Sequence, residues 1–167
     1  MDFFDVKCQS GPFKQEYFGV CDDQLGQIAY VDTIVENAEK WIARVENARQ
    51  VPVTFTAIDK CVIQDFDELG RGRCDAMLTT QNSLTLLELK ERNPKSDWRQ
   101  HACDQLESTI RFLMENHPRQ LEQFTRKKAQ ACNRKRPGFV VLEQELKRRF
   151  LNYGFRIDTQ ATVVVVS

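Results

Sequence analysis

The sequence predicts an α/β protein in which helices flank a mixed β-sheet. Apolar residues recur at helical spacing after Thr33, after Asp97 and between Val140 and Tyr153. Between these segments lie short runs rich in β-branched and aromatic residues, which is the composition typical of strands. The predicted element order is α-β-β-β-α-β-α-β, and such an alternation favours a sheet covered by helices.

Length and composition predict one domain over residues 1–167, with an N-terminal segment and helix in 1–50 and the core in 51–166. The chain has 167 residues, of which 41 % are hydrophobic, and this is enough to build a sizeable core. No apolar run approaches the roughly 20 residues that span a bilayer, so we expect no membrane partner. The first residues lack the pattern of a signal peptide, and a cytoplasmic location is therefore expected.

The cysteines are expected to be reduced. Their spacing contains no C-x-x-C pair that would indicate zinc binding or redox chemistry. An even number of cysteines does not by itself indicate disulfides in a cytosolic chain. We therefore predict that all of them serve as small core residues. They are residues 8, 21, 61, 74, 103 and 132.

The first half of the chain is predicted to supply a helix and three strands. Six apolar residues between Ile34 and Val45 recur at helical spacing, with Asp32 or Thr33 as the N-cap. The run from Val51 to Ile58 reads as a strand, and its extension to Ile63 is left open. Two further strands are expected at about 73–80 and 83–92, and a short strand at 17–21 is a further candidate.

The second half is predicted to alternate helices and strands. Asn93-Pro94 ends the preceding strand because proline cannot donate to the ladder. Trp98, Ala102, Leu106, Ile110 and Leu113 form the apolar stripe of a helix capped by Ser96 or Asp97. The remaining expectations are a short helix from Pro118 to about Phe124, a strand at 127–133, a helix at 140–153 closed by Gly154, and a final strand at 162–166 buried on both faces.

Charge is distributed unevenly along the sequence. Residues 1–95 carry 11 basic and 16 acidic side chains, whereas residues 96–167 carry 13 basic and 8 acidic ones. Basic clusters of this kind attract polyanions such as nucleic acids, but they also occur on solvated surfaces that bind nothing. The clusters are Arg126-Lys127-Lys128, Arg134-Lys135-Arg136 and Lys147-Arg148-Arg149.

The most informative motif is an acidic residue two positions before a lysine on a predicted strand. Three such tripeptides occur, at Asp5-Val-Lys7, Glu88-Leu-Lys90 and Glu145-Leu-Lys147. The last falls in a predicted helix, where residues two apart face different directions. Glu88 and Lys90 lie on an apolar strand, so their side chains share one face, and Asp75 lies on the preceding strand. Two carboxylates and an amine on one sheet suit a hard cation and an attacking water.

Asp75, Glu88-Leu-Lys90 and the following amphipathic helix resemble the PD-(D/E)XK nuclease superfamily, which has the restriction-endonuclease-like fold. The resemblance spans residues 53–113. It implies that Asp75, Glu88 and the Leu89 carbonyl bind Mg²⁺ or Mn²⁺ and that Lys90 activates the water or stabilises developing charge. Some branches of the superfamily add a helical glutamine at the active site, and Gln105 matches that position.

The sequence also departs from this superfamily. Cys74 stands where a proline often precedes the first aspartate, and Thr109 stands where a tyrosine often follows the glutamine. A glutamate on the first helix is common among relatives, but nothing in the sequence chooses between Glu36 and Glu39.

The resemblance implies a Mg²⁺-dependent enzyme that hydrolyses phosphodiester bonds, with DNA favoured over RNA as substrate. A nuclease-like fold that serves as a protein-interaction or immunity-type module is the alternative. A third reading is a nucleic-acid-binding protein without chemistry. The structural alternative for Asp75, Glu88 and Lys90 is an ion pair on a half-exposed sheet. Relatives that cut both strands often form homodimers, but no feature of the sequence decides this.

Overall fold

The sequence folds into a mixed α/β structure with two mixed sheets. The computed structural model describes residues 1–92, 97–135, 138 and 140–166. The predicted strand end at Asn93-Pro94, the capping residue Ser96 and the basic residue Arg136 lie outside these ranges. Within them, no helix is both long and apolar enough to cross a membrane.

The large sheet has six strands in the order β1-β5-β6-β7-β8-β9. The pairs β1-β5, β5-β6 and β6-β7 are antiparallel, whereas β7-β8 and β8-β9 are parallel. β7 therefore lies inside the sheet, with strands bonded to both of its edges. The strands span β1 Gln9–Phe13, β5 Val53–Ala57, β6 Ala76–Thr79, β7 Ser83–Lys90, β8 Arg126–Asn133 and β9 Arg156–Thr159.

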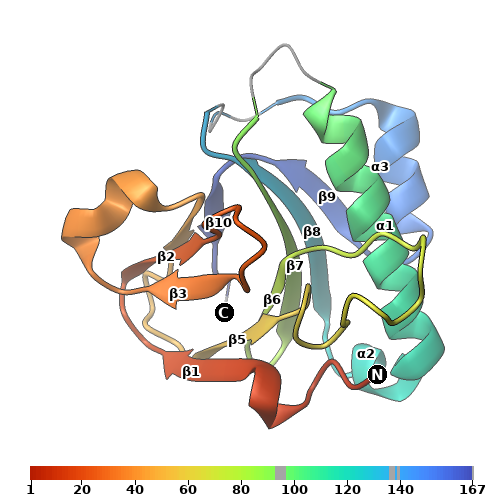
Figure 1. Ribbon diagram of the computed structural model, residues 1–167, viewed down its shortest axis with the longest axis horizontal. Coiled ribbons are helices and arrows are strands. Elements are labelled where there is room, and N and C mark those ends of the chain that lie inside the picture. Colours follow the sequence, from red (N-terminus) through yellow and green to blue (C-terminus); the bar gives the residue numbers. More distant parts are fainter. Residues whose placement is uncertain (93–96, 136–137, 139, 167) are drawn as a thin grey trace.

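The small sheet has four strands in the order β10-β4-β2-β3. It packs on one face of the large sheet, and helices α1 and α3 cover the other face (Figure 1). The chain therefore forms a helix layer, a central sheet and a second sheet. The strands are β2 Tyr17–Cys21, β3 Tyr30–Asp32, β4 Ala43–Glu46 and β10 Thr162–Val164, and the helices are η1 Val6–Cys8, η2 Val35–Lys40, α1 Trp98–Asn116, α2 Pro118–Glu122 and α3 Gln144–Leu151.

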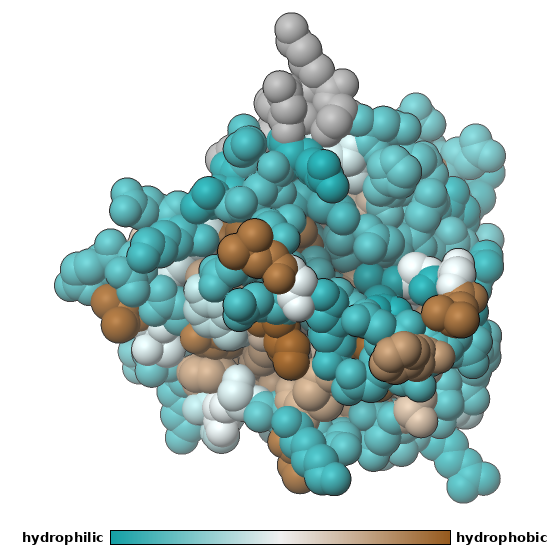
Figure 2. Space-filling view, in the orientation of Figure 1, coloured by the Kyte–Doolittle hydropathy of each residue, from teal (hydrophilic) through white to brown (hydrophobic). Residues whose placement is uncertain are grey.

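Two hydrophobic clusters fill the spaces on either side of the large sheet. Leu84 and Leu86 of β7 join the cluster beneath α1, and Leu87 and Leu89 join the cluster against the small sheet. Figure 2 shows a mostly hydrophilic surface, with hydrophobic residues over the middle of the molecule. The strand β7 thus presents buried leucines to both clusters, and Glu88 lies among them.

The helix predicted around Ile34–Val45 is wrong. Residues 35–40 form the 3-10 helix η2, and the chain then becomes the strand β4. The stripe fails because Ile34 and Val35 are exposed, whereas Trp41, Ile42 and Val45 are buried. In β4 the burial alternates with a period of two, because the strand pairs with β2 and β10 at long range. The predicted element order is corrected accordingly, since residues 1–50 provide four strands.

Other expectations hold in part. The strands at 17–21, 51–58, 73–80, 83–92 and 127–133 correspond to β2, β5, β6, β7 and β8, and the helices after Asp97 and Pro118 to α1 and α2. The strand from Val53 ends at Ala57 and does not reach Ile63, and α3 covers only Gln144–Leu151. β9 was not predicted. β10 is an edge strand of the small sheet with Val164 exposed, so the expectation that it is buried on both faces is wrong.

The expectation that all six cysteines are reduced is wrong for two of them. Cys8 and Cys61 form a disulfide between Cα atoms 5.7 Å apart, which joins the segment before β1 to the turn after β5. The remaining four are free and buried, as predicted. Burial raises the pKa of the Cys21 and Cys103 thiols to about 11, which keeps them protonated and unreactive at neutral pH.

We expect four thiols to react in unfolded, unreduced protein and six after reduction. Loss of the cross-link should lower the free energy of unfolding by about 2–4 kcal/mol, because the bridge closes a loop of 53 residues in the unfolded chain. Thiol titration in denaturant and chemical unfolding with and without reductant measure both effects. Six reactive thiols before reduction would contradict the bridge.

Gly19 in β2 allows close contact with Trp41. A Cβ atom at this position would lie 2.0 Å from Cγ of the buried Trp41 ring. We expect Gly19→Ala to lower the free energy of unfolding by about 1–3 kcal/mol, the usual cost of overpacking. Gly138→Ala is the matched control, since no described atom lies within 4 Å of its Cβ position. Equal unfolding midpoints for the two variants in urea would contradict the argument.

Candidate active site

The candidate site lies at the carboxyl end of β7. Glu88 and Lys90 are two apart on this strand and share the face beneath α1, as their spacing predicts. Glu88 is only 1 % exposed, although it carries a carboxylate. Its Oε1 lies 2.7 Å from Lys90 Nζ, and its Oε2 is buried without a hydrogen-bond partner among the described residues.

Asp75 lies beside Glu88, at the point where the partner strand begins. The β6-β7 register pairs Ala76 with Leu87, and the Asp75 amide donates to the Leu87 carbonyl over 3.1 Å. Asp75 Oδ2 accepts a hydrogen bond of 2.6 Å from the Leu89 amide. The side chain of Asp75 therefore satisfies an N–H group that β6 is too short to reach.

Gln105 joins the group from α1. Its Oε1 accepts a 2.8 Å hydrogen bond from Lys90 Nζ, and its Nε2 donates to the Arg73 carbonyl over 3.3 Å. The structure thus brings together Asp75, Glu88, Lys90 and Gln105, the four side chains singled out in the sequence. Lys90 Nζ is the centre of this arrangement, because it contacts both Glu88 and Gln105.

Thr109 links α1 by a hydrogen bond to the segment that leads through Asp75 into β6. The Thr109 hydroxyl donates to the Gln105 carbonyl and accepts from the Cys74 amide, at 2.9 and 2.8 Å. Both Thr109 and Cys74 are fully buried. The two positions that depart from the superfamily pattern therefore contact each other and place Asp75 relative to Gln105.

Burial and neighbouring negative charges raise the pKa of both carboxyls. Burial, with smaller contributions from the charges of Asp22 and Asp59, raises the pKa of Asp75 to about 7 against the opposing effects of the Leu89 amide and Lys90. The pKa of Glu88 is raised well above its ordinary value by burial and by the charge of Asp75, against the opposing effect of Lys90. Two carboxyls with raised pKa values are typical of a functional site, because a bound cation would strongly stabilise their ionised forms.

Sequence reasoning missed two acids beside this group. Asp22 follows β2 and Asp59 follows β5, and the charge of each raises the pKa of Asp75. Asp59 also pairs with Arg73, whose guanidinium reaches Asp65. The available signal was their position directly after predicted strands. Glu36 and Glu39, by contrast, lie on η2, and no contact to the four site side chains is found for them among the described residues.

The donor set fits a hard divalent cation. Asp75 and Glu88 supply carboxylate oxygens, and Glu88 Oε2 is a buried acceptor that finds no partner in the described part of the chain. The Leu89 carbonyl points to the same side as its amide, which faces Asp75. Oxygen donors of these types are those that Mg²⁺ and Mn²⁺ prefer. No group of three or more His, Cys, Asp or Glu residues placed to hold a metal occurs in the described ranges.

The basic clusters differ in position and partners. Arg134 follows β8 beside the site, since its amide donates to the Lys90 carbonyl, and its side chain pairs with Glu91. Arg149 of α3 pairs with Asp104 and Glu107. Arg126, Lys127 and Lys128 begin β8 and lie at its opposite end.

Comparison of the chain with protein-family models, curated proteins and solved structures gives no match.

The raised pKa of Asp75 predicts how stability depends on pH. A carboxyl whose pKa rises from 3.8 to about 7 on folding stabilises the fold while it is protonated, and this contribution is lost as the pH rises through about 7. We expect Asp75→Asn to raise the free energy of unfolding at pH 8 by on the order of 2–4 kcal/mol in the absence of divalent metal. The difference from wild type should vanish near pH 4.

Urea unfolding between pH 4 and pH 8 measures this effect. Glu145→Gln is the matched control, because Glu145 is an exposed acid on α3 in the second Glu-Leu-Lys tripeptide. A variant Asp75→Asn that is less stable than wild type at pH 8 would show that Asp75 is charged and well paired there.

Proposed function

We propose that this chain is a PD-(D/E)XK nuclease-like enzyme that hydrolyses phosphodiester bonds with Mg²⁺, and that DNA is favoured over RNA as substrate. The observation that carries the proposal is that Lys90 Nζ contacts both Glu88 and Gln105 at 2.7 and 2.8 Å, while Asp75 is held beside them by its 2.6 Å hydrogen bond from the Leu89 amide. Fold-level likeness alone would not support an activity, because one fold hosts many functions. The combination of two carboxylates, an ammonium and a positioning amide supports it.

Each residue has a role that its contacts allow. Asp75 and Glu88 would hold Mg²⁺ together with the Leu89 carbonyl. When bound, Mg²⁺ supplies Lewis-acid chemistry that neutralises phosphate charge and lowers the pKa of a water molecule. Lys90 offers a fixed positive charge beside Glu88, where it can orient the attacking water or stabilise the negative charge that develops on the phosphate. Gln105 is a positioning residue, because it holds Lys90 Nζ at 2.8 Å.

The surroundings of the site suit a polyanionic substrate. Arg134 and Lys135 follow β8 at the same end of the sheet as Lys90, and Arg134 is exposed despite its pairing with Glu91. Such side chains contact the phosphate backbone and do not read bases. We therefore propose cleavage directed by the structure of the substrate or by a partner. We also propose a homodimer and a cytoplasmic location. The Cys8–Cys61 disulfide argues against the cytoplasmic location, because disulfides are unusual in a reducing compartment.

A nuclease-like module that acts only as a protein-interaction or immunity-type partner is the second candidate. It is favoured by one observation: the described residues hold no cluster of three His, Cys, Asp or Glu side chains that could bind a metal. In this case Lys90 would be a permanent counter-ion for Glu88, and the group would stabilise the packing of α1 on the sheet.

Cleavage assays on single-stranded, duplex and branched DNA and on RNA separate the two candidates. We expect Mg²⁺-dependent cleavage that falls at least 100-fold in Glu88→Gln and Lys90→Ala, because each removes a group that acts on the reacting phosphate or water. The matched controls Glu145→Gln and Lys147→Ala change the same residue types in a helix and should cleave at the wild-type rate. Equal activity in all five proteins would place the reaction outside this site.

Calorimetric titration with Mn²⁺ completes this test. Binding that is lost in Asp75→Ala supports the metal site even if the natural substrate is missing from the assay. Absence of both binding and cleavage would favour the interaction module.

A further inference from the structure

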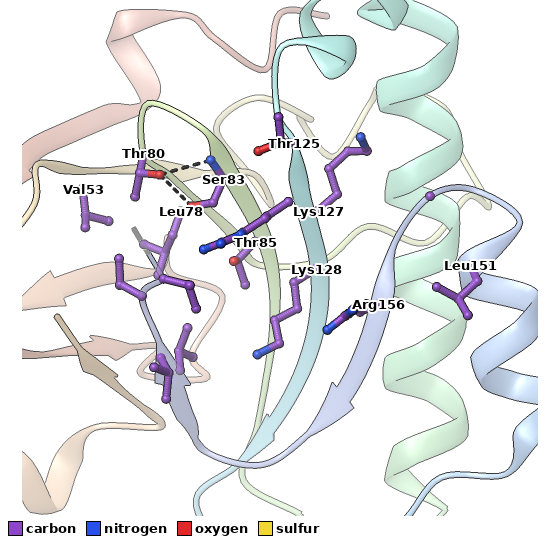
Figure 3. A pocket seen from close by; sticks show the side chains of 16 residues that line it. Val53, Leu78, Thr80, Ser83, Thr85, Thr125, Lys127, Lys128, Leu151 and Arg156 are labelled. Atoms are coloured by element: carbon purple, nitrogen blue, oxygen red, sulfur yellow. Dashed lines mark hydrogen bonds between the residues drawn. The ribbon is translucent and has the colours of Figure 1, made fainter. Parts of the chain in front are cut away.

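A cavity of about 560 Å³ opens at the other end of β7, away from the candidate active site (Figure 3). Ser83 at the start of the strand lines it, whereas Lys90 ends the strand, and the eight-residue strand places the two about 23 Å apart. Its volume lies within the range of small-molecule sites, roughly 300–1,000 Å³. The group around Glu88 does not take part in this cavity.

The cavity exists because the two sheets diverge at the turn between β9 and β10. The buried Gln130 pins this turn, since its Nε2 donates to the carbonyls of Gln160 and Thr162 over 2.8 and 2.7 Å. From there β9 stays in the large sheet, whereas β10 pairs with β4 of the small sheet. The cavity is lined by residues of both strands, so it lies between the two sheets.

The large sheet provides a basic wall. The strand register places Thr85, Lys128 and Arg156 side by side on β7, β8 and β9, and Figure 3 shows the last two on neighbouring strands. Arg126, two residues before Lys128, shares their face. Like charges on adjacent strands repel each other. Lys128 is balanced by Asp158 at 2.9 Å, but neither Arg126 nor Arg156 forms an ion pair within the described part of the chain.

The opposite wall is aliphatic. It consists of the consecutive valines 163–166, of which Val164 and Val166 are about half exposed, whereas the aliphatic Val53 and Leu78 line the large-sheet side from β5 and β6. No acidic and no aromatic side chain is among the described residues of the lining. Nucleobases are usually bound by stacking on aromatic rings, so this lining does not suit a base.

From this pairing of walls we infer that the cavity binds a small amphipathic anion, with a carboxylate or phosphate head group on an aliphatic chain. The head group pairs with the guanidinium of Arg156, which offers two parallel N–H donors to such an anion, and with Arg126. The aliphatic chain lies against the valines of β10 and Leu78. This inference does not depend on the proposed nuclease function, because it concerns different residues at the other end of the sheet.

Isothermal titration with decanoate and with decyl phosphate, both below their micelle concentrations, tests the inference. We expect one molecule to bind per chain, and the two arms show which head group is preferred. Decanol and inorganic phosphate each carry half of the proposed chemistry, so each should bind at least ten-fold more weakly than the better amphipathic anion. Binding of decanol as tight as that of the anions would overturn the role of the basic wall.

Two variants and a control locate the site. Arg156→Gln removes an exposed, unpaired cation from the lining, and we expect it to raise the dissociation constant at least ten-fold. Val164→Asn makes the aliphatic wall polar and should weaken binding by several-fold. Arg148→Gln removes the same charge from the exposed surface of α3 outside the lining and should bind as wild type does. Melting curves of the free variants check that each is folded.

The proposal fails if neither anion binds, or if wild type, Arg156→Gln and Arg148→Gln bind equally. It also fails if a single-stranded DNA 12-mer displaces the anion and loses affinity to the same extent in Arg156→Gln, because the basic wall would then be a nucleic-acid backbone contact.

Discussion

The buried ion pair between Glu88 and Lys90 is the interaction on which the packing of α1 against the sheet depends. A carboxylate that is 1 % exposed costs several kcal/mol of desolvation unless a partner is held close to it. Lys90 supplies that partner at 2.7 Å, and Gln105 holds the ammonium from the other side. The position of α1 on the sheet is therefore coupled to the charge on β7. Thr109 strengthens this coupling because it bonds both α1 and the strand of Asp75.

The site forms where β7 extends beyond the end of its pairing with β6. The antiparallel ladder ends at the pair of Ala76 and Leu87, so the Leu89 amide has no backbone partner on that edge. A buried N–H group without an acceptor is costly, and Asp75 Oδ2 fills the role. The same carboxylate is thereby brought beside Glu88, and its charge adds to the effect of burial in raising the pKa of Glu88. The early end of the β6-β7 ladder thus also creates the pair of neighbouring carboxyls, because the same Asp75 side chain bonds the Leu89 amide and lies beside Glu88.

The sequence was informative where pattern and contact are local. The α1 stripe, the strand β7 and the shared face of Glu88 and Lys90 follow from periodicity alone, and the match of Gln105 to a superfamily position predicted its place beside them. The strands β1, β3, β4 and β9 could not be read in this way, because they are short and paired at long range. The segment around Trp41 shows the ambiguity: Ile42 and Val45 fit a helical stripe, yet burial in the small sheet decides for a strand. Asp22 approaches the site from the end of β2 in the small sheet and Asp59 from the turn after β5 in the large sheet, so their nearness to Asp75 depends on long-range strand pairing that no local motif encodes.

The formal net charge of zero conceals two opposite fields along β7. At its carboxyl end, Asp75 and Glu88 lie beside one lysine, and burial makes the negative charge of these two carboxyls costly until a cation compensates it. At its amino end, Arg126, Lys128 and Arg156 face an aliphatic wall with only Asp158 to balance them. About 23 Å exceeds two Debye lengths at physiological ionic strength, so solvent-exposed charges at the two ends do not neutralise each other. At each end one ion pair leaves part of the charge uncompensated, acidic at the carboxyl end and basic at the amino end, so the two ends favour ligands of opposite sign.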